Sequence, residues 1–153
     1  MKIFHGIPGV GRALTEQEVI DFLITSKKNL NLGTIDEKDE PNVHPVWFLY
    51  ENEKIYVATE TKSKKVKNIQ KNNLVYFSVD DDASDYRGVR GKGTVNIIED
   101  IEFNVKITEK IVMKYAGSLE GNLAREVMDE IKNGLEVVLE ITPNFYSTWS
   151  FDL

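Results

Sequence analysis

The feature that most restricts the fold is a series of short β-like segments separated by turns. The segments are rich in β-branched and aromatic residues, as strands are, and stretches such as "DEKDEPN" and "ENEK" separate them. The predicted strands cover residues 30–37, 41–50, 54–60, 74–81, 86–98, 135–142 and 145–151. Antiparallel strands of this kind hide their edges best when the sheet closes on itself. We therefore expect a mostly β, α+β fold: an antiparallel barrel.

A few short helices should flank this barrel. They are predicted over residues 15–26, after Ser63 within 61–73, over 102–115 and over 122–132. Thr15 and Glu18 form a capping box, and Leu123, Val127 and Ile131 should lie on one face of the last helix. Residues 1–12, with "GIPGVG", are expected to be an irregular arm of a single domain, 1–153.

Composition narrows the function classes. The formal charge of -6 and the pI near 5.0 argue against nucleic acid as the main partner, because a phosphate backbone requires a broad basic surface. The chain has no cysteine, so disulfides and thiolate metal sites are excluded. The two histidines have no acidic partners at metal-binding spacing, and no metal is expected. No apolar run is long enough to span a membrane, and we expect a cytoplasmic protein.

Basic residues gather in one place, "TKSKKVKNIQKNN", from Thr61 to Asn73. Ser63 is a good N-cap, so Lys64 and Lys65 fall in the first turn of the helix. The helix dipole disfavours cations there by about 0.3–1 kcal/mol each, whereas a bound phosphate would offset this cost. From local chemistry alone, three interpretations stay open: a solvated basic face, a phosphate site, or a nucleic-acid patch.

Two other strands carry residues of structural interest. Pro45, in "NVHPVWFLY", has no N–H to donate, so its strand should lie at an edge or a gap of the sheet. In "RGVRGKG" the glycines should let another backbone, or a ligand, come close.

Three motifs together resemble the pyridoxamine 5'-phosphate oxidase-related, FMN-binding split-barrel family. They are the strand, acidic turn and Pro-x-x-x-Pro-Val-Trp-Phe of "LNLGTIDEKDEPNVHPVWFLY"; the strand and Ser-Lys-Lys helix start of "KIYVATETKSKKVKNIQKNNLVYF"; and "VRGKGTV" with the distant Trp149. The resemblance covers about 15–151 and implies an antiparallel split barrel. It also implies a homodimer that holds FMN in a groove between its two subunits.

The resemblance also implies the roles of individual residues. Ser63, Lys64 and Lys65 match the positions that hold the flavin phosphate, and Ala58 and Thr59 match the strand end beside the ribityl chain. The residues that match the strand along the flavin ring are His44, Pro45, Val46, Trp47 and Phe48. Trp149 matches an aromatic residue that reaches the flavin from the partner chain, and Arg87 lies where the family places a further polar contact.

The resemblance favours an FMN-dependent oxidoreductase that acts on a small molecule, with NAD(P)H as a possible electron donor. No residue is assigned as catalytic. Trp149 is followed by Ser-Phe-Asp-Leu in place of the family's Arg-Leu-His-Asp-Arg run, so we do not expect true pyridoxamine phosphate oxidase activity. Three alternatives remain: a reductase that uses a deazaflavin coenzyme, a flavin carrier or electron-transfer protein without turnover, and an interaction module with an empty groove.

Overall fold

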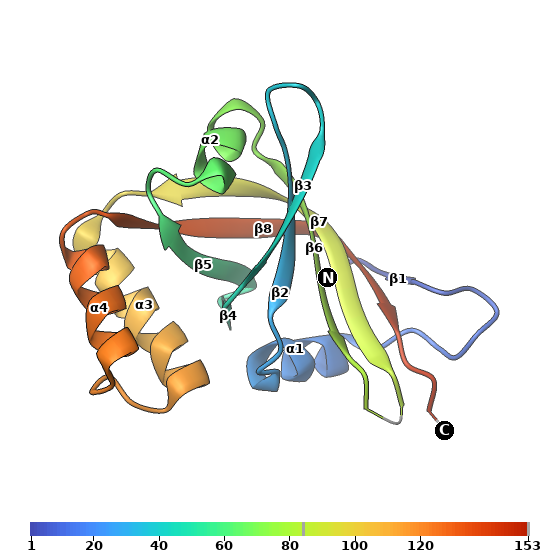
Figure 1. Ribbon diagram of the computed structural model, residues 1–153. Helices are drawn as coiled ribbons and strands as arrows, with labels where there is room; N and C mark the ends of the chain where they lie inside the picture. Colours follow the sequence, from blue (N-terminus) through green and yellow to red (C-terminus); the bar gives the residue numbers. More distant parts are fainter. Residues whose placement is uncertain (84, 153) are drawn as a thin grey trace.

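The computed structural model describes residues 1–83 and 85–152, and strands and helices fill most of this range (Figure 1). The strands are β1 (Ile3–His5), β2 (Leu30–Ile35), β3 (Pro41–Val46), β4 (Leu49–Glu51), β5 (Lys54–Glu60), β6 (Leu74–Asp81), β7 (Arg87–Ile98) and β8 (Glu136–Trp149). The helices are α1 (Glu16–Thr25), α2 (Lys64–Lys71), α3 (Ile101–Ala116) and α4 (Asn122–Lys132). The single domain expected over 1–153 includes Ser84 and Leu153, which lie outside the described residues.

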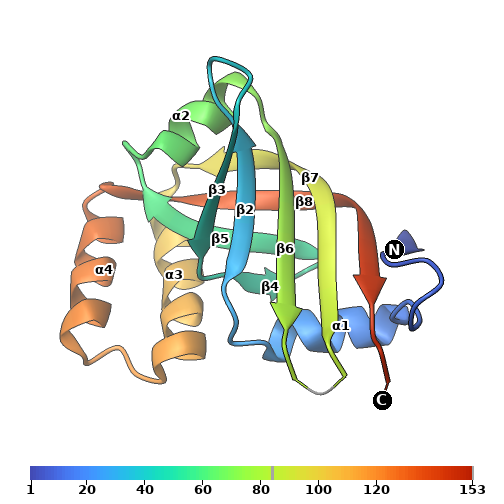
Figure 2. The ribbon, with the colours of Figure 1, turned by 45° about the vertical axis from the view of Figure 1, so that its right-hand side comes forward.

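The sheet is an antiparallel split barrel. Its strands follow the order β3-β2-β6-β7-β8-β5-β4, each antiparallel to its neighbour, and the short β1 adds to β8 in parallel. The two end strands, β3 and β4, are separated in the chain only by Trp47 and Phe48. The chain itself therefore crosses the split, and the predicted fold class is confirmed (Figure 2).

The position of Pro45 agrees with its chemistry. Pro45 lies in β3, opposite Asn31 of β2. Strand β3 is the outermost strand on its side of the sheet, as predicted. The strand predicted over 41–50 is, however, two strands. The chain turns inward at Phe48, whose side chain is fully buried, and resumes as β4. Burial of one aromatic ring thus overrides the local β-pattern.

Two further predictions of strands were wrong. The arm over 1–12 is not wholly irregular, because Ile3–His5 pair with Tyr146–Thr148 and Arg12 bridges to Ser150. The strands predicted over 135–142 and 145–151 are one strand, β8. A register shift opposite Lys92 and Gly93 absorbs one residue, so β8 continues past Pro143.

The helices begin and end where their capping residues predict. Thr15 and Glu18 form the capping box of α1, Ser63 accepts the N–H of Val66 at the start of α2, and α3 ends at Gly117 with a left-handed conformation. The predicted apolar face of α4 is not the face that is most buried. Its buried residues are Ala124, Met128 and Ile131, whereas Leu123 is 61% exposed. Within the described residues, no helix is long and apolar enough to cross a membrane.

Two apolar clusters stabilise this arrangement. One fills the barrel, and the other packs α3 and α4 against the outer face of β5 and β8, around residues such as Tyr56, Met128 and Val138. Figure 1 shows these two helices side by side at one end of the sheet, with α1 at the other. The molecule therefore has two ends that β8 connects.

Gly88 provides the close approach expected of a glycine in β7. A Cβ atom at this position would lie 2.2 Å from Cζ2 of Trp149, which is buried on the neighbouring strand β8. Real side-chain contacts do not reach this distance, so even alanine would displace the indole.

We expect Gly88→Ala to lower the free energy of unfolding by about 1–3 kcal/mol, because the added methyl group overpacks the indole of Trp149. Gly33→Ala is the matched control. Gly33 is also inside a strand, but its nearest neighbour would be the Tyr76 carbonyl oxygen at 3.4 Å, an ordinary contact. Thermal or urea unfolding of both variants measures the difference. Equal stability of the two variants would contradict the assigned packing.

Candidate functional site

A cleft of about 320 Å³ lies where β3, the end of β5, the start of α2 and the α3–α4 pair meet. This volume lies in the range of small-molecule sites, about 300–1,000 Å³. Seven residues predicted to bind a cofactor line it: His44, Pro45, Val46, Trp47, Ala58, Thr59 and Lys65. An adjoining hollow shares His44 and Lys65 and adds Ser63 and Lys64. Three separate segments of the chain thus bring nine of the twelve predicted residues together.

Local hydrogen bonds fix the start of α2 at this cleft. Thr61 donates through its backbone N–H to Leu135 and through its hydroxyl to Gly134, both at 2.9 Å, which ties the loop before α2 to the start of β8. Further along the helix, the buried Asn68 donates to the Thr34 hydroxyl of β2 at 3.0 Å. The N-terminus of α2 is therefore held rigidly between two strands.

The two lysines at this helix start differ in their surroundings. Lys64 is half exposed and forms an ion pair with Glu37 at 3.0 Å. Lys65 is only 9% exposed, lines the cleft, and forms no ion pair within residues 1–83 and 85–152. No acidic residue lies in the first turn of α2. A lysine that lines a cleft beside the free N–H groups of a helix start is an arrangement that suits an anion.

An acidic residue also lines the cleft. Glu136, at the start of β8, is 9% exposed, and its Oε2 has no hydrogen-bond partner among the described residues. Burial, the charges of the nearby Glu130 and Glu60, and a hydrogen bond with the Glu130 side chain together raise the pKa of this carboxyl to about 7, while Lys65 acts in the opposite direction. Glu136 is therefore partly protonated at neutral pH.

An aromatic wall closes the cleft at the split of the barrel. Trp47 stacks face to face on Tyr115 of α3, with ring centroids 4.8 Å apart. The Tyr115 hydroxyl donates to the Lys28 carbonyl at 2.9 Å and accepts the Phe48 N–H at 3.3 Å. Burial raises the pKa of Tyr115 to about 12, so this hydroxyl remains protonated. Trp47 thus presents a flat, fixed surface to a ligand.

Phe48 lies elsewhere than its neighbours in the same motif. Its ring is in the core and does not line the cleft. The ammonium of Lys114 lies 3.6 Å from the centre of this ring and donates to the Phe48 carbonyl at 3.1 Å. Burial lowers the pKa of Lys114 to about 8. The backbone and ring of Phe48 therefore serve to hold the split together.

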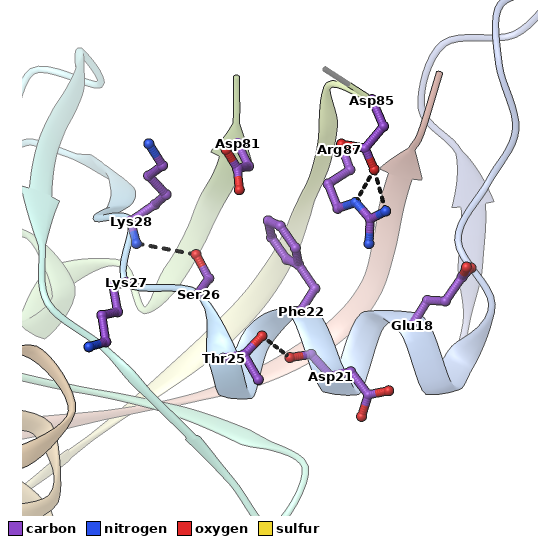
Figure 3. A pocket seen from close by; sticks show the side chains of 10 residues that line it. All are labelled: Glu18, Asp21, Phe22, Thr25, Ser26, Lys27, Lys28, Asp81, Asp85 and Arg87. Carbon is purple, nitrogen blue, oxygen red and sulfur yellow. Dashed lines mark hydrogen bonds and ion pairs between the residues drawn. The ribbon is translucent and has the colours of Figure 1, made fainter. Parts of the chain in front are cut away.

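Arg87 and Trp149 lie at the other end of the molecule. Trp149 pairs with Gly88 where β8 ends, and its ring stacks on Tyr86 at 6.0 Å. Arg87 lines a hollow of about 750 Å³ between α1 and the β6–β7 hairpin and forms an ion pair with Asp85 (Figure 3). Charged side chains from both elements surround this hollow, and Phe22 points toward it from α1. The structure does not bring Arg87 or Trp149 to the cleft of the same chain.

Sequence analysis missed the helical wall of the cleft. This wall consists of Thr108, Ile111 and Val112 of α3, and Leu123 and Val127 of α4. The sequence predicted that Leu123 and Val127 share one face of a helix, but not that this face borders a cleft. No group of three or more His, Asp or Glu side chains in the described part of the chain could hold a metal ion.

Comparisons with known proteins agree with this geometry. Residues 16–150 match the family model described as pyridoxamine 5'-phosphate oxidase. A search among curated proteins finds no match to the sequence.

Solved structures share the fold. A conserved hypothetical protein from Mycobacterium tuberculosis is 22% identical, with a TM-score of 0.80 over 95% of this chain and 89% of that one. An F420 reductase is 25% identical, with a TM-score of 0.68 over 83% of this chain and 94% of its own. An FAD-binding protein from Mesorhizobium loti is 18% identical, with a TM-score of 0.66 over 91% and 96% of the two chains. With a family match over nearly its whole length, the chain belongs to the pyridoxamine 5'-phosphate oxidase family.

Proposed function

We propose that this protein is an FMN-binding oxidoreductase that acts on a small molecule in the cytoplasm and holds its flavin in a groove between two subunits. The observation that carries the proposal is Lys65, a residue only 9% exposed that lines the cleft, lacks an ion pair within the described residues and lies in the first turn of a helix. A flavin phosphate would supply the missing negative charge.

The walls of the cleft fit the rest of such a cofactor. Val46 and the stacked Trp47 offer a flat apolar surface, and Ile111, Val112 and Val127 line the same cleft. A flavin supplies hydride or electron transfer when bound, and the protein supplies binding, orientation and a dry surrounding. Ser63 and Lys64 extend the anion site, because Lys64 can exchange its exposed pair with Glu37 for a phosphate.

A second subunit would complete the site with Arg87 and Trp149, which are remote from the cleft of their own chain. The surface of β3 supports this proposal. Val43 is 71% exposed in this outermost strand, and Tyr76, which lies opposite the same Gly33 on β6, is 56% exposed. Exposed apolar residues on an unpaired edge are typical of a surface that another chain covers.

The deazaflavin coenzyme of F420 reductases is the second candidate, since one such enzyme is 25% identical to this chain. Its acidic tail would need further cations beyond the phosphate anchor. Lys62, Lys67 and Arg90 are exposed and could provide them. Mass spectrometry of the molecule that co-purifies with the protein separates the two candidates. Titration with FMN and with the deazaflavin coenzyme then ranks their affinities.

We expect Lys65→Ala to weaken FMN binding by at least about tenfold, because a charge-assisted phosphate contact contributes roughly 1.5–3 kcal/mol. Lys67→Ala is the matched control, since it removes the same charge from the exposed side of the same helix. Flavin fluorescence quenching measures both affinities, and circular dichroism checks the fold. If Lys65→Ala and Lys67→Ala bind FMN equally, the phosphate is not anchored at Lys65.

We also expect Lys65→Ala and Arg87→Ala to complement each other. Heterodimers purified with two different tags should regain about half of the wild-type FMN sites, because one of the two grooves then contains both wild-type residues. Each variant alone should bind weakly. Heterodimers no better than the parent variants would contradict a groove shared between subunits, as would elution of the wild type as a monomer at micromolar concentration.

A further inference from the structure

Two buried polar atoms in the walls of the cleft have no hydrogen-bond partner within residues 1–83 and 85–152. One is Oε2 of Glu136, on β8, and the other is Oγ1 of Thr108, on α3. Thr108 is fully buried and Glu136 is 9% exposed. Leaving such an atom unpaired costs about 1–3 kcal/mol, so buried polar groups almost always have a partner. Of the five such atoms among the described residues, these two lie on one cleft, where a bound molecule could pair with both.

We propose that Thr108 and Glu136 form a polar subsite of the cleft that takes an uncharged hydrogen-bond acceptor, such as a carbonyl oxygen or an unprotonated ring nitrogen. This inference rests on the proposed function in one respect only: the proposed function says which molecule occupies the cleft. The acceptor belongs either to the cofactor ring or to a second molecule that reacts with it, and the experiment below distinguishes these sources.

The charges around Glu136 select this class of ligand. Glu60 faces it from β5, Glu130 from α4 and Lys65 from α2. Burial and the two neighbouring carboxyl groups favour the protonated form of Glu136, which raises its pKa to about 7. A protonated carboxyl and a hydroxyl can both donate a hydrogen bond.

The apolar part of the wall disfavours a ligand that carries a charge at this subsite. Ile111, Val112 and Val127 surround the subsite with apolar surface, in which an unpaired charge is costly. A second anion, besides the one near Lys65, would meet the carboxyl groups of Glu60, Glu130 and Glu136. A neutral acceptor on an apolar body satisfies both orphaned atoms without adding a charge.

The sign of the pH dependence follows from this geometry. The acceptor binds when Glu136 carries its proton, so affinity is full below pH 7 and falls as the carboxyl ionises above it. Glu136→Gln keeps the size and an N–H donor but cannot ionise. The ratio of the wild-type dissociation constant to that of Glu136→Gln should therefore rise about tenfold between pH 6 and pH 8. Taking this ratio cancels the ionisation of the ligand's own phosphate.

Two probes separate the sources of the acceptor. FMN is titrated into the wild type and Glu136→Gln, and menadione, an uncharged diketone, is titrated into both proteins with and without FMN. A ratio that rises with FMN assigns the acceptor to the cofactor ring, and one that rises only with menadione assigns it to the second molecule. A flat ratio with both probes, or one that falls with pH as a cationic ligand would require, overturns the subsite.

The same titrations distinguish failure of the proposed function from failure of the subsite. A wild type that binds no FMN and no deazaflavin coenzyme would overturn the proposed function, while menadione binding to the free protein would still decide the subsite.

Thr108→Val tests the second donor without reference to charge. It should weaken binding of the same probe by about five- to tenfold, while the ligand-free protein melts at the same temperature or higher, because an orphaned hydroxyl is removed. Thr148→Val is the matched control: Thr148 is equally buried, but its hydroxyl accepts the Leu14 N–H at 2.9 Å. This control should lower the melting temperature. An equal loss of stability in Thr108→Val would show that its hydroxyl serves the fold and would overturn the subsite.

Discussion

Strand β8 is the constraint on which the rest of the structure depends. Its 14 residues pair with β7 along most of their length, with β5 at the start and with β1 toward the end. Glu136 begins the strand beside the cleft, and Trp149 ends it opposite Gly88 of β7, at most about 44 Å away in an extended strand. Because a strand paired on both sides is rigid, it holds the two groups of predicted site residues apart. A site that uses both groups has to be assembled from two chains.

The lysine cluster illustrates how tertiary structure divides a local pattern. Lys62, Lys67 and Lys71 are exposed to solvent, as expected of a basic surface on an acidic protein. Lys64 forms an ion pair with Glu37, in the turn between β2 and β3. Lys65 lies on the buried side of the same helix with Val66 and Ile69, and so it lines the cleft. The solvated face and the proposed anion site, which sequence alone left as alternatives, are therefore adjacent sides of one helix.

The parts of the fold that sequence predicted are those that neighbouring residues determine. The alternation of 54–60 and 74–81, the Ser63 cap and the glycine stops after α3 and α4 all depend on contacts within a few residues. Strand β1 could not be predicted, because three residues gain strand geometry only by pairing with a segment over 140 positions away. The same reason explains the missed site residues: Thr108 and Glu136 look like ordinary helix and strand positions until α3 packs on the outer face of β8.

Family membership accounts for the barrel fold. The chemistry of the cleft depends instead on the side chains that line its walls. The phosphate site proposed at Ser63–Lys65 would accept any phosphate ester, so it would not discriminate between cofactors or substrates. Discrimination has to come from the walls that the remainder of the ligand touches. Here those walls include both the Glu136 carboxyl, whose pKa is raised to about 7, and the stacked Trp47. Since hydrogen-bonding groups left unpaired in a dry site exclude the wrong ligand more strongly than apolar contacts do, the α3–β8 wall is where this chain's specificity should reside.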